Sequence, residues 1–184
     1  MSAKIERLEM DALAPALQQA LAARVKRLGY LGEFFKCAGH QPDVLLPFMT
    51  MTDALKDALP DRLTEVGALT VAVLMGNAYE RHQHERLSEK LGFGRDWVAA
   101  VIAAQPDADG AMTPDERAVQ RLAIAMVERR GHDVEAELDA VVGAIGQGPA
   151  MALLFLIGRY VTHAYIVNAL ALAPPVPSIF QAAS

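Results

Sequence analysis

The segment from Asn77 to His84 carries the residues of this chain best suited to proton transfer. If the segment is helical, Asn77, Glu80 and His84 lie within about 60° of one another, because positions three, four and seven apart share a helix face. An amide, a carboxylate and an imidazole then line one wall. Glu65 lies twelve positions before Asn77, on the preceding segment. Such a set predicts a general acid–base site.

His84 and Glu65 are the candidate catalytic residues. The imidazole of His84 can give a proton to a carbanion or take one from an acid, because it titrates near neutral pH. Glu65 is a lone carboxylate in an apolar stretch, where it can act as an acid or orient His84. The structural alternatives are a core histidine bonded to Glu80 and a first-turn glutamate favoured by the helix dipole.

Asn77, Tyr79 and Glu80 are the candidate substrate-binding residues. Asn77 can donate a hydrogen bond to a developing oxyanion, or it can cap the helix that follows it. Tyr79 is also consistent with a core or interface residue. Glu80 is also consistent with an ion-pair partner for Arg81 or Arg159.

The pair His82 and His84 does not predict a metal site. Residues two apart on a helix point about 200° away from each other, so the two rings cannot share an ion. Glu80 and His84 could share one with His163 as a third ligand, but nothing in their spacing fixes that geometry. We expect no metal and no cofactor. Three histidines are interpreted as surface residues: His40, His82 and His132.

Length and composition narrow the class of protein. A chain of 184 residues suits one domain with a sizeable core. Its hydrophobic residues reach 53% without glycine, whereas typical soluble domains reach about 45–50% with glycine included. We therefore expect part of this surplus to be buried between copies in a homo-oligomer. The net charge of −5 disfavours nucleic-acid binding, which needs a basic face.

Cys37 is the single cysteine, so the chain can form neither an intramolecular disulfide nor a dithiol pair. It is interpreted as a small buried hydrophobic residue. A chain poor in cysteine fits a reducing compartment. Charged residues throughout Met1 to Gly29 leave no continuous apolar run of the signal-peptide type. We expect a cytoplasmic protein.

The stretch from Met151 to Ala173 is the most apolar part of the chain. It contains Arg159, His163 and Asn168, which are costly in hydrocarbon. It therefore predicts a buried helix, at a core or a subunit interface, rather than a membrane span.

Nearly every segment has the composition of a helix. Alanine, leucine and glutamate dominate, and no series of alternating strands occurs. Proline and glycine mark the expected helix ends, and Thr113 to Glu116 predicts a capping box. The predicted helices are Asp11–Arg27, Gly32–Gly39, Pro42–Leu59, Leu63–Met75, Tyr79–Leu91, Asp96–Ala104, Arg117–Arg130, Val134–Ile145 and Pro149–Leu172. We predict an all-α fold with a single domain over residues 1–184.

The order of residues from Arg62 to Gly94 resembles the carboxymuconolactone decarboxylase and alkylhydroperoxidase D family. The matching features are Glu65, the apolar stretch 69–74, the signature Asn77-x-Tyr79-Glu80-x-x-x-His84 and Gly92. The resemblance covers roughly residues 39–173. It implies a helical bundle that assembles as a trimer or hexamer.

In the redox branch of that family, cysteines are expected at the positions of Asn77 and Glu80. This chain lacks both, and a dithiol peroxidase needs an attacking thiolate with a resolving thiol close by. Peroxidase activity of that kind is not expected. The resemblance is instead to the decarboxylase branch, which implies a cofactor-free lyase or isomerase acting on a small unsaturated acid or lactone. His84 would deliver the proton, assisted by Glu65.

Two other interpretations stay open. A non-catalytic helical oligomer would bind a small ligand or partner on the family scaffold, and a residual thiol enzyme would use Cys37. A closed pocket would favour the binding protein. An open pocket with Glu65 and His84 in hydrogen-bond reach would favour the lyase or isomerase.

Overall fold

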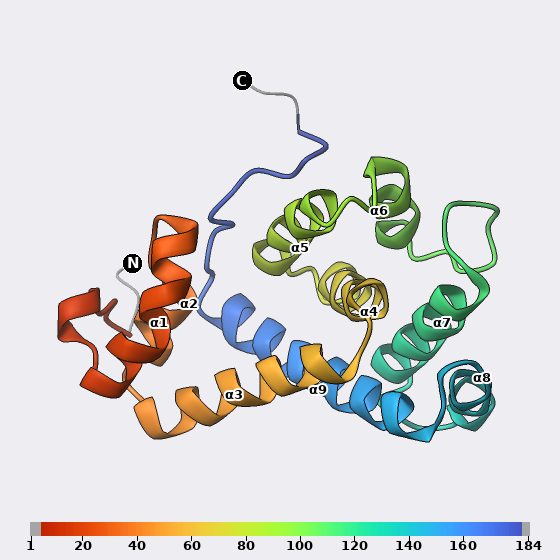
Figure 1. Cartoon of the computed structure of the whole chain (residues 1–184), viewed down its shortest axis with the longest axis horizontal. Coiled ribbons are helices and arrows are strands. Elements are labelled where there is room, and N and C mark those ends of the chain that lie inside the picture. The colour runs from red at the N-terminus through yellow and green to blue at the C-terminus, as the bar shows by residue number, and fades with distance from the viewer. Residues whose placement is uncertain (1–4, 182–184) are drawn as a thin grey trace.

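Residues 5–181 are described by the structure, a computed structural model, and they fold into helices without a β-strand (Figure 1). The predicted all-α class is confirmed. Residues 1–4 and 182–184 of the predicted single domain lie outside the described residues. The α-helices are α1 (Pro15–Leu28), α2 (Glu33–Ala38), α3 (Pro42–Ala58), α4 (Asp61–Leu74), α5 (Ala78–Lys90), α6 (Arg95–Ile102), α7 (Pro114–Glu128), α8 (Glu135–Ile145) and α9 (Gln147–Ala169).

The first helix begins later than the sequence predicts. Met10–Ala12 forms a short 3₁₀ turn, and α1 starts only at Pro15. Proline fixes a helical φ and lacks the N–H that a first helical residue leaves unbonded, so it favours this start. The helix ends at Gly29, whose φ of 82° is a left-handed conformation that suits glycine. The expected end is thus confirmed and the expected start is wrong.

The most buried element is α4, and other helices pack around it. Ten consecutive residues, from Leu63 to Ala72, are buried. The helix packs mainly against α7, α5 and α9, which surround it in Figure 1. At Gly67 an added Cβ would lie 3.0 Å from Leu156 Cδ2 of α9. The missing side chain therefore lets α9 approach α4 closely.

A short turn joins α4 to α5. Gly76 adopts φ +61° in this turn, and the side chain of Asn77 caps α5 by accepting a hydrogen bond from the Glu80 N–H. The turn returns the chain so that α5 packs against α4. Residues nineteen positions apart, Glu65 and His84, come into contact as a result.

Two apolar clusters form the interior. The larger surrounds α4 and includes Leu69, Leu122 and Leu153. The smaller joins α1, α2 and α3 to α5 and α9, with Leu17 and Phe34 among its members. The candidate site lies where the N-terminal helices meet α5 and α9, because its lining comes from both sides.

One helix among residues 5–181 is long and apolar enough to cross a membrane by length and composition, namely α9. Within its most apolar window, 44% is buried inside the protein. Core helices of soluble proteins pass the same test. The charged side chain of Arg159 lies half-buried within α9, as expected for a helix that packs against protein.

The C-terminal segment runs alongside α5 (Figure 1). Arg86 Nε donates to the Pro177 carbonyl at 2.9 Å, and Ser178 Oγ donates to Glu85 Oε2 at 2.5 Å. His82 Nδ1 lies 3.0 Å from the Val176 carbonyl oxygen. The segment therefore buries His82, and the prediction of a surface residue is wrong for it. His40 and His132 are exposed, as predicted.

Candidate functional site

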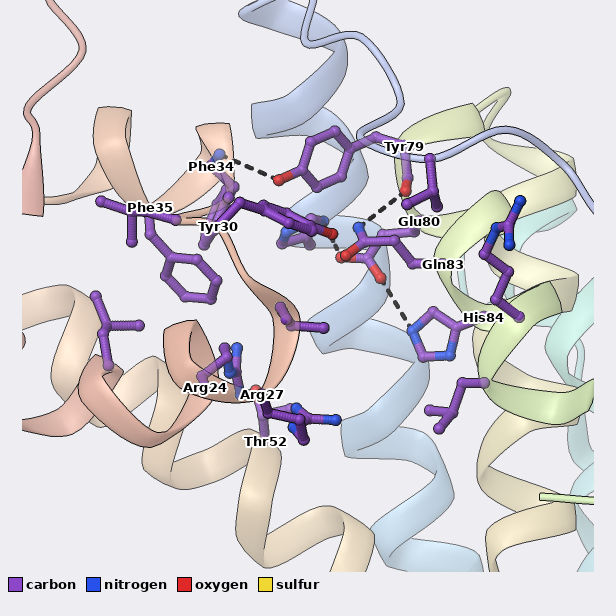
Figure 2. A pocket seen from close by; sticks show the side chains of 18 of the residues that line it. Arg24, Arg27, Tyr30, Phe34, Phe35, Thr52, Tyr79, Glu80, Gln83 and His84 are labelled. Carbon is purple, nitrogen blue, oxygen red and sulfur yellow. Dashed lines mark hydrogen bonds and ion pairs between the residues drawn. The ribbon is translucent and has the colours of Figure 1, made fainter. Parts of the chain in front are cut away.

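A cavity of about 270 Å³ lies between the N-terminal helices and α5 and α9 (Figure 2). Its size is near the lower end of the range of ligand pockets, about 300–1,000 Å³, so it suits a small ligand. Arg27, Arg86 and Lys90 line it and are exposed, so the cavity reaches the surface. The side of the cavity on α5 presents Glu80 and His84.

His84 is held by Glu65 from behind the cavity. Its Nδ1 lies 2.7 Å from Glu65 Oε2, and a carboxylate oxygen can only accept, so Nδ1 carries the proton. Ser88 Oγ donates to the same Glu65 oxygen at 3.3 Å. Glu65 is buried and does not line the cavity. It is therefore placed to orient His84 rather than to touch a ligand.

The other ring nitrogen of His84 faces the cavity side. Nε2 lies 2.9 Å from Glu80 Oε2 and 3.1 Å from the Tyr160 hydroxyl oxygen. Glu80 and Tyr160 both line the cavity. The predicted residues His84, Glu65 and Glu80 are thus brought together, and α9 adds Tyr160 to them.

His163 is the second histidine beside Glu80. Its Nδ1 lies 3.1 Å from Glu80 Oε1, but without the geometry of a hydrogen bond. The ring packs among aromatic side chains, with the Phe34 centroid at 4.2 Å and that of Phe48 at 6.5 Å. Its neighbours are therefore mainly apolar.

The charges of the cluster shift its pKa values. Burial alone would lower the pKa of His84, but the charges of Glu65 and Glu80 and their hydrogen bonds raise it to about 9. Burial would raise the pKa of Glu80, but His163, His84 and Arg159 hold it well below its usual range. At neutral pH the cluster therefore contains an imidazolium and an ionised Glu80.

Burial dominates for two other groups at the cavity. It lowers the pKa of His163 to about 4, against the opposing charge of Glu80. It also raises the pKa of Tyr160, despite the charge of Arg159. His163 is thus neutral at pH 7, and Tyr160 keeps its O–H as a hydrogen-bond donor.

Tyr79 joins α5 to the N-terminal helices. Its hydroxyl oxygen accepts a hydrogen bond from the Phe34 N–H at 3.3 Å, shown by a dashed line in Figure 2. An added Cβ at Gly32 would lie 2.9 Å from that oxygen, so the ring fits beneath a glycine. Burial, chiefly, raises the pKa of Tyr79 and keeps it protonated. Tyr79 lines the cavity and also fixes its wall.

Asn77 does not line the cavity. Its side-chain oxygen is used as the N-cap of α5, 3.1 Å from the Glu80 nitrogen, and the residue is buried. The oxyanion role predicted for Asn77 is therefore not favoured by its position. Tyr160 is the neutral donor beside Nε2 of His84.

Sequence reasoning did not find Tyr160 or the cavity position of Arg159. Both lie on α9, about eighty residues after the signature, and no local spacing connects them to His84. The described residues contain no group of three or more His, Cys, Asp or Glu side chains arranged to hold a metal ion. Cys37 is buried and lies outside the cavity lining, and burial raises the pKa of its thiol.

A family match supports the architecture of this site. Residues 42–125 match the model of the Carboxymuconolactone decarboxylase family. The matched segment runs from α3 into α7 and contains Glu65, Glu80 and His84, so the chain resembles that family over this segment. No curated protein sequence matches the chain significantly.

Solved structures share the fold. An alkylhydroperoxidase AhpD core protein from Ralstonia eutropha, described as an uncharacterized peroxidase-related protein, superposes with a TM-score of 0.79 at 18% identity, over 94% of each chain. The debrominase Bmp8, as a cysteine-to-alanine variant in complex with 2,3,4-tribromopyrrole, gives a TM-score of 0.80 at 18% identity, over 94% of this chain and 92% of the other. At these identities the comparison shows the fold, and the helical-bundle prediction is confirmed.

Proposed function

We propose that this protein is a cofactor-free lyase or isomerase that acts by acid–base chemistry on a small unsaturated acid or lactone. The observation that carries the proposal is the position of His84, clamped between Glu65 and Glu80 at the wall of a cavity that a small molecule can enter. A catalytic histidine is typically oriented by one partner and faces its substrate with the other nitrogen.

A decarboxylation illustrates the chemistry. In an acid whose carboxylate is on the saturated carbon next to an alkene that is conjugated with a lactone carbonyl, the bond to the carboxylate breaks and CO₂ leaves. The electron pair passes into a dienolate, and its oxygen receives a hydrogen bond from the Tyr160 O–H. The Nε2 proton of His84 is then delivered to carbon. His84 regains a proton from solvent, which closes the cycle.

Glu65 and Glu80 have different tasks in this scheme. Glu65 holds Nδ1 of His84 and stabilises the imidazolium from behind. Glu80 contacts Nε2 and is itself exposed to the cavity. We infer that Glu80, which stays ionised because its pKa is held low, keeps Nε2 of His84 protonated between turnovers. An isomerase of the same type would use His84 both to take a proton and to return it elsewhere.

The binding-protein alternative is less well supported. The cavity reaches the surface through exposed rim residues, and Glu65 and His84 are in hydrogen-bond reach. Both features favour chemistry over passive binding. The thiol alternative is also disfavoured, since a buried thiol with a raised pKa is a poor nucleophile. Treatment with iodoacetamide should leave turnover unchanged.

The test is decarboxylation of 4-carboxymuconolactone and of a panel of related lactones, followed by ultraviolet absorbance and CO₂ release. Wild-type protein is compared with His84→Gln and with His132→Gln, which changes an exposed histidine away from the cavity. Turnover lost only in His84→Gln supports the proposal. Turnover that is equal in all three proteins contradicts the mechanism, and no turnover across the panel contradicts the activity.

We also propose that the protein is a homo-oligomer, a trimer or hexamer. Met151 and Phe155 of α9 are 54% and 59% exposed, and Tyr165 further along the helix is 65% exposed. A shallow apolar depression beside them is lined by Phe48 and Leu154. Apolar surface of this kind typically lies in a contact between subunits. Light scattering should give an oligomeric mass for the wild-type protein and a lower mass for Phe155→Glu. A monomeric mass for the wild-type protein would contradict the proposal.

A further inference from the structure

The cavity has a second wall that the acid–base cluster does not use. Arg24 of α1, Lys56 of α3 and Arg159 of α9 line it and are half-buried. Figure 2 shows Arg24 and Thr52 across the cavity from Glu80 and His84. The whole chain has a net charge of −5. A local excess of positive charge in such a protein requires a specific explanation.

These cations form no direct ion pair within the described residues, although the charges of Asp53 and Glu65 act on Arg24 and Lys56 from further away. Within residues 5–181, no ion pair joins Arg24, Lys56 or Arg159 to an acidic side chain. Arg24 instead lies over the Phe35 ring, 5.0 Å from its centroid. Half-buried charges are costly without a counter-charge, so an anion would relieve the cost.

The guanidinium of Arg159 is held in one orientation by its neighbours. Its Nε donates to Thr52 Oγ1 at 3.0 Å, and its guanidinium lies 4.4 Å from the Tyr160 ring centroid. Its Nη1 is buried and has no hydrogen-bond partner among the described residues. A guanidinium that is fixed through its Nε and lines the cavity is suited to bind a carboxylate. Burial, first of all, lowers the pKa of Lys56; the charge of Glu65 opposes this shift, and the charges of Arg24 and Arg159 add to it.

We propose that Arg24, Lys56 and Arg159, the last held by the Thr52 hydroxyl, form a carboxylate-binding subsite that holds the anionic group of the substrate across the cavity from His84. This inference rests on the proposed function, because the bound anion is the substrate of that reaction. Arg24 and Arg159 lie outside the segment that matches the family model, so they are features of this chain rather than of the matched segment. The subsite selects acids over neutral lactones and sets their orientation.

Binding without turnover tests this subsite. Furoate and furandicarboxylate, with their methyl esters as neutral counterparts, are titrated by calorimetry into the full-length protein. We expect each acid to bind at least about tenfold more tightly than its ester, a difference of about 1.4 kcal/mol. The preference should disappear in Arg24→Gln and in Lys56→Met. Lys26→Met, which removes an exposed lysine of α1 outside the cavity lining, should keep it.

Arg159 packs against aromatic rings, so Arg159→Gln can lose structure as well as charge. Arg159→Lys retains the charge and should keep most of the preference. Equal affinity of acid and ester, or no binding of either acid at millimolar concentration, would overturn the subsite. His84→Gln separates the two proposals: it should bind acids like wild type while losing turnover. Acid preference without any turnover would leave the subsite standing and refute the enzyme.

Discussion

The wall of the cavity on α5 and the wall on α1, α3 and α9 both carry charge, but they differ in how that charge is balanced. On the first wall His84 lies between two carboxylates, at 2.7 and 2.9 Å. On the second, Arg24, Lys56 and Arg159 have no acidic partner among the described residues. The first wall is complete before a ligand arrives, as catalysis requires. Under the proposed carboxylate subsite, the second wall gains its counter-charge when an anion binds.

The two histidines beside Glu80, His84 and His163, also differ in how their charge is balanced. His84 donates hydrogen bonds to carboxylates on both sides, and its pKa is raised to about 9. His163 shares Glu80 but packs against Phe34 and Phe48, and burial lowers its pKa to about 4. One carboxylate near a buried imidazole is thus not enough to keep it charged. The second carboxylate, Glu65, decides the difference.

The largest expected effect follows from removing the imidazole. His84→Gln should lower kcat by about 100- to 10,000-fold, which is the usual contribution of a general acid or base. His163→Gln changes the neutral histidine of the same cavity and should lower kcat far less. Steady-state kinetics on whichever substrate of the panel is turned over would measure both. Equal losses in the two variants would break the distinction between the histidines.

Glu65→Gln should have a smaller effect, because it removes the charge behind His84 but keeps a hydrogen-bond acceptor. A hydrogen bond to a charged group contributes about 1.5–3 kcal/mol, and the variant replaces it with a weaker neutral one, so the rate should fall by no more than about 10- to 150-fold. The pKa of His84 should fall with it, so the alkaline limb of the pH–rate profile moves to lower pH. A lower rate with the alkaline limb at the same pH would mean that Glu65 supports the fold but does not set the pKa of His84.

The stability of the protein should depend on pH in opposite senses through the two histidines. For His84 the folded pKa of about 9 lies above the ordinary 6.5, so its stabilisation is fully present below pH 6.5 and is lost as pH rises to 9. For His163 the folded pKa of about 4 lies below 6.5, so stability is lost as pH falls from 6.5 towards 4.

Each contribution is on the order of 3 kcal/mol. Urea unfolding at a series of pH values should therefore give a maximum near pH 6.5. Glu80, whose pKa is held low, adds to the acid loss, so the effect of His163 is best read above about pH 4.5. His84→Gln should flatten the alkaline side, and His163→Gln the acid side. An unfolding free energy that stays constant from pH 6.5 to 9 would contradict the charge assigned to His84.

The smallest effect concerns Asn77. Asn77→Ala should cost about 1 kcal/mol of unfolding free energy through loss of the N-cap of α5. Asn77→Ser retains a capping oxygen and should restore both stability and rate. Thermal unfolding and kinetics of the two variants distinguish a cap from an oxyanion donor. Stable Asn77→Ser protein with a rate as low as that of Asn77→Ala would return Asn77 to the substrate site.

The sequence predicts the local features of this molecule well. Pro42, Pro114 and Gly29 mark helix ends because they constrain the backbone directly, and the Thr113–Glu116 capping box is present as expected. The contact of Glu65 with His84 could also be anticipated, through the resemblance of their spacing to a known family. Tyr160, Arg24 and the burial of His82 depend on packing between distant segments. No local pattern encodes those contacts.

Direct measurement of the protonation of His84 tests the central claim of this account. Histidine-selective carbon-13 labelling, with His84→Gln and His163→Gln used for assignment, follows the rings by NMR from pH 4.5 to 9.5. We predict that His84 titrates at about 9 and that His163 stays neutral down to the acid end of the series. A His84 signal that becomes neutral below pH 6.5 would contradict an imidazolium held ready for proton transfer.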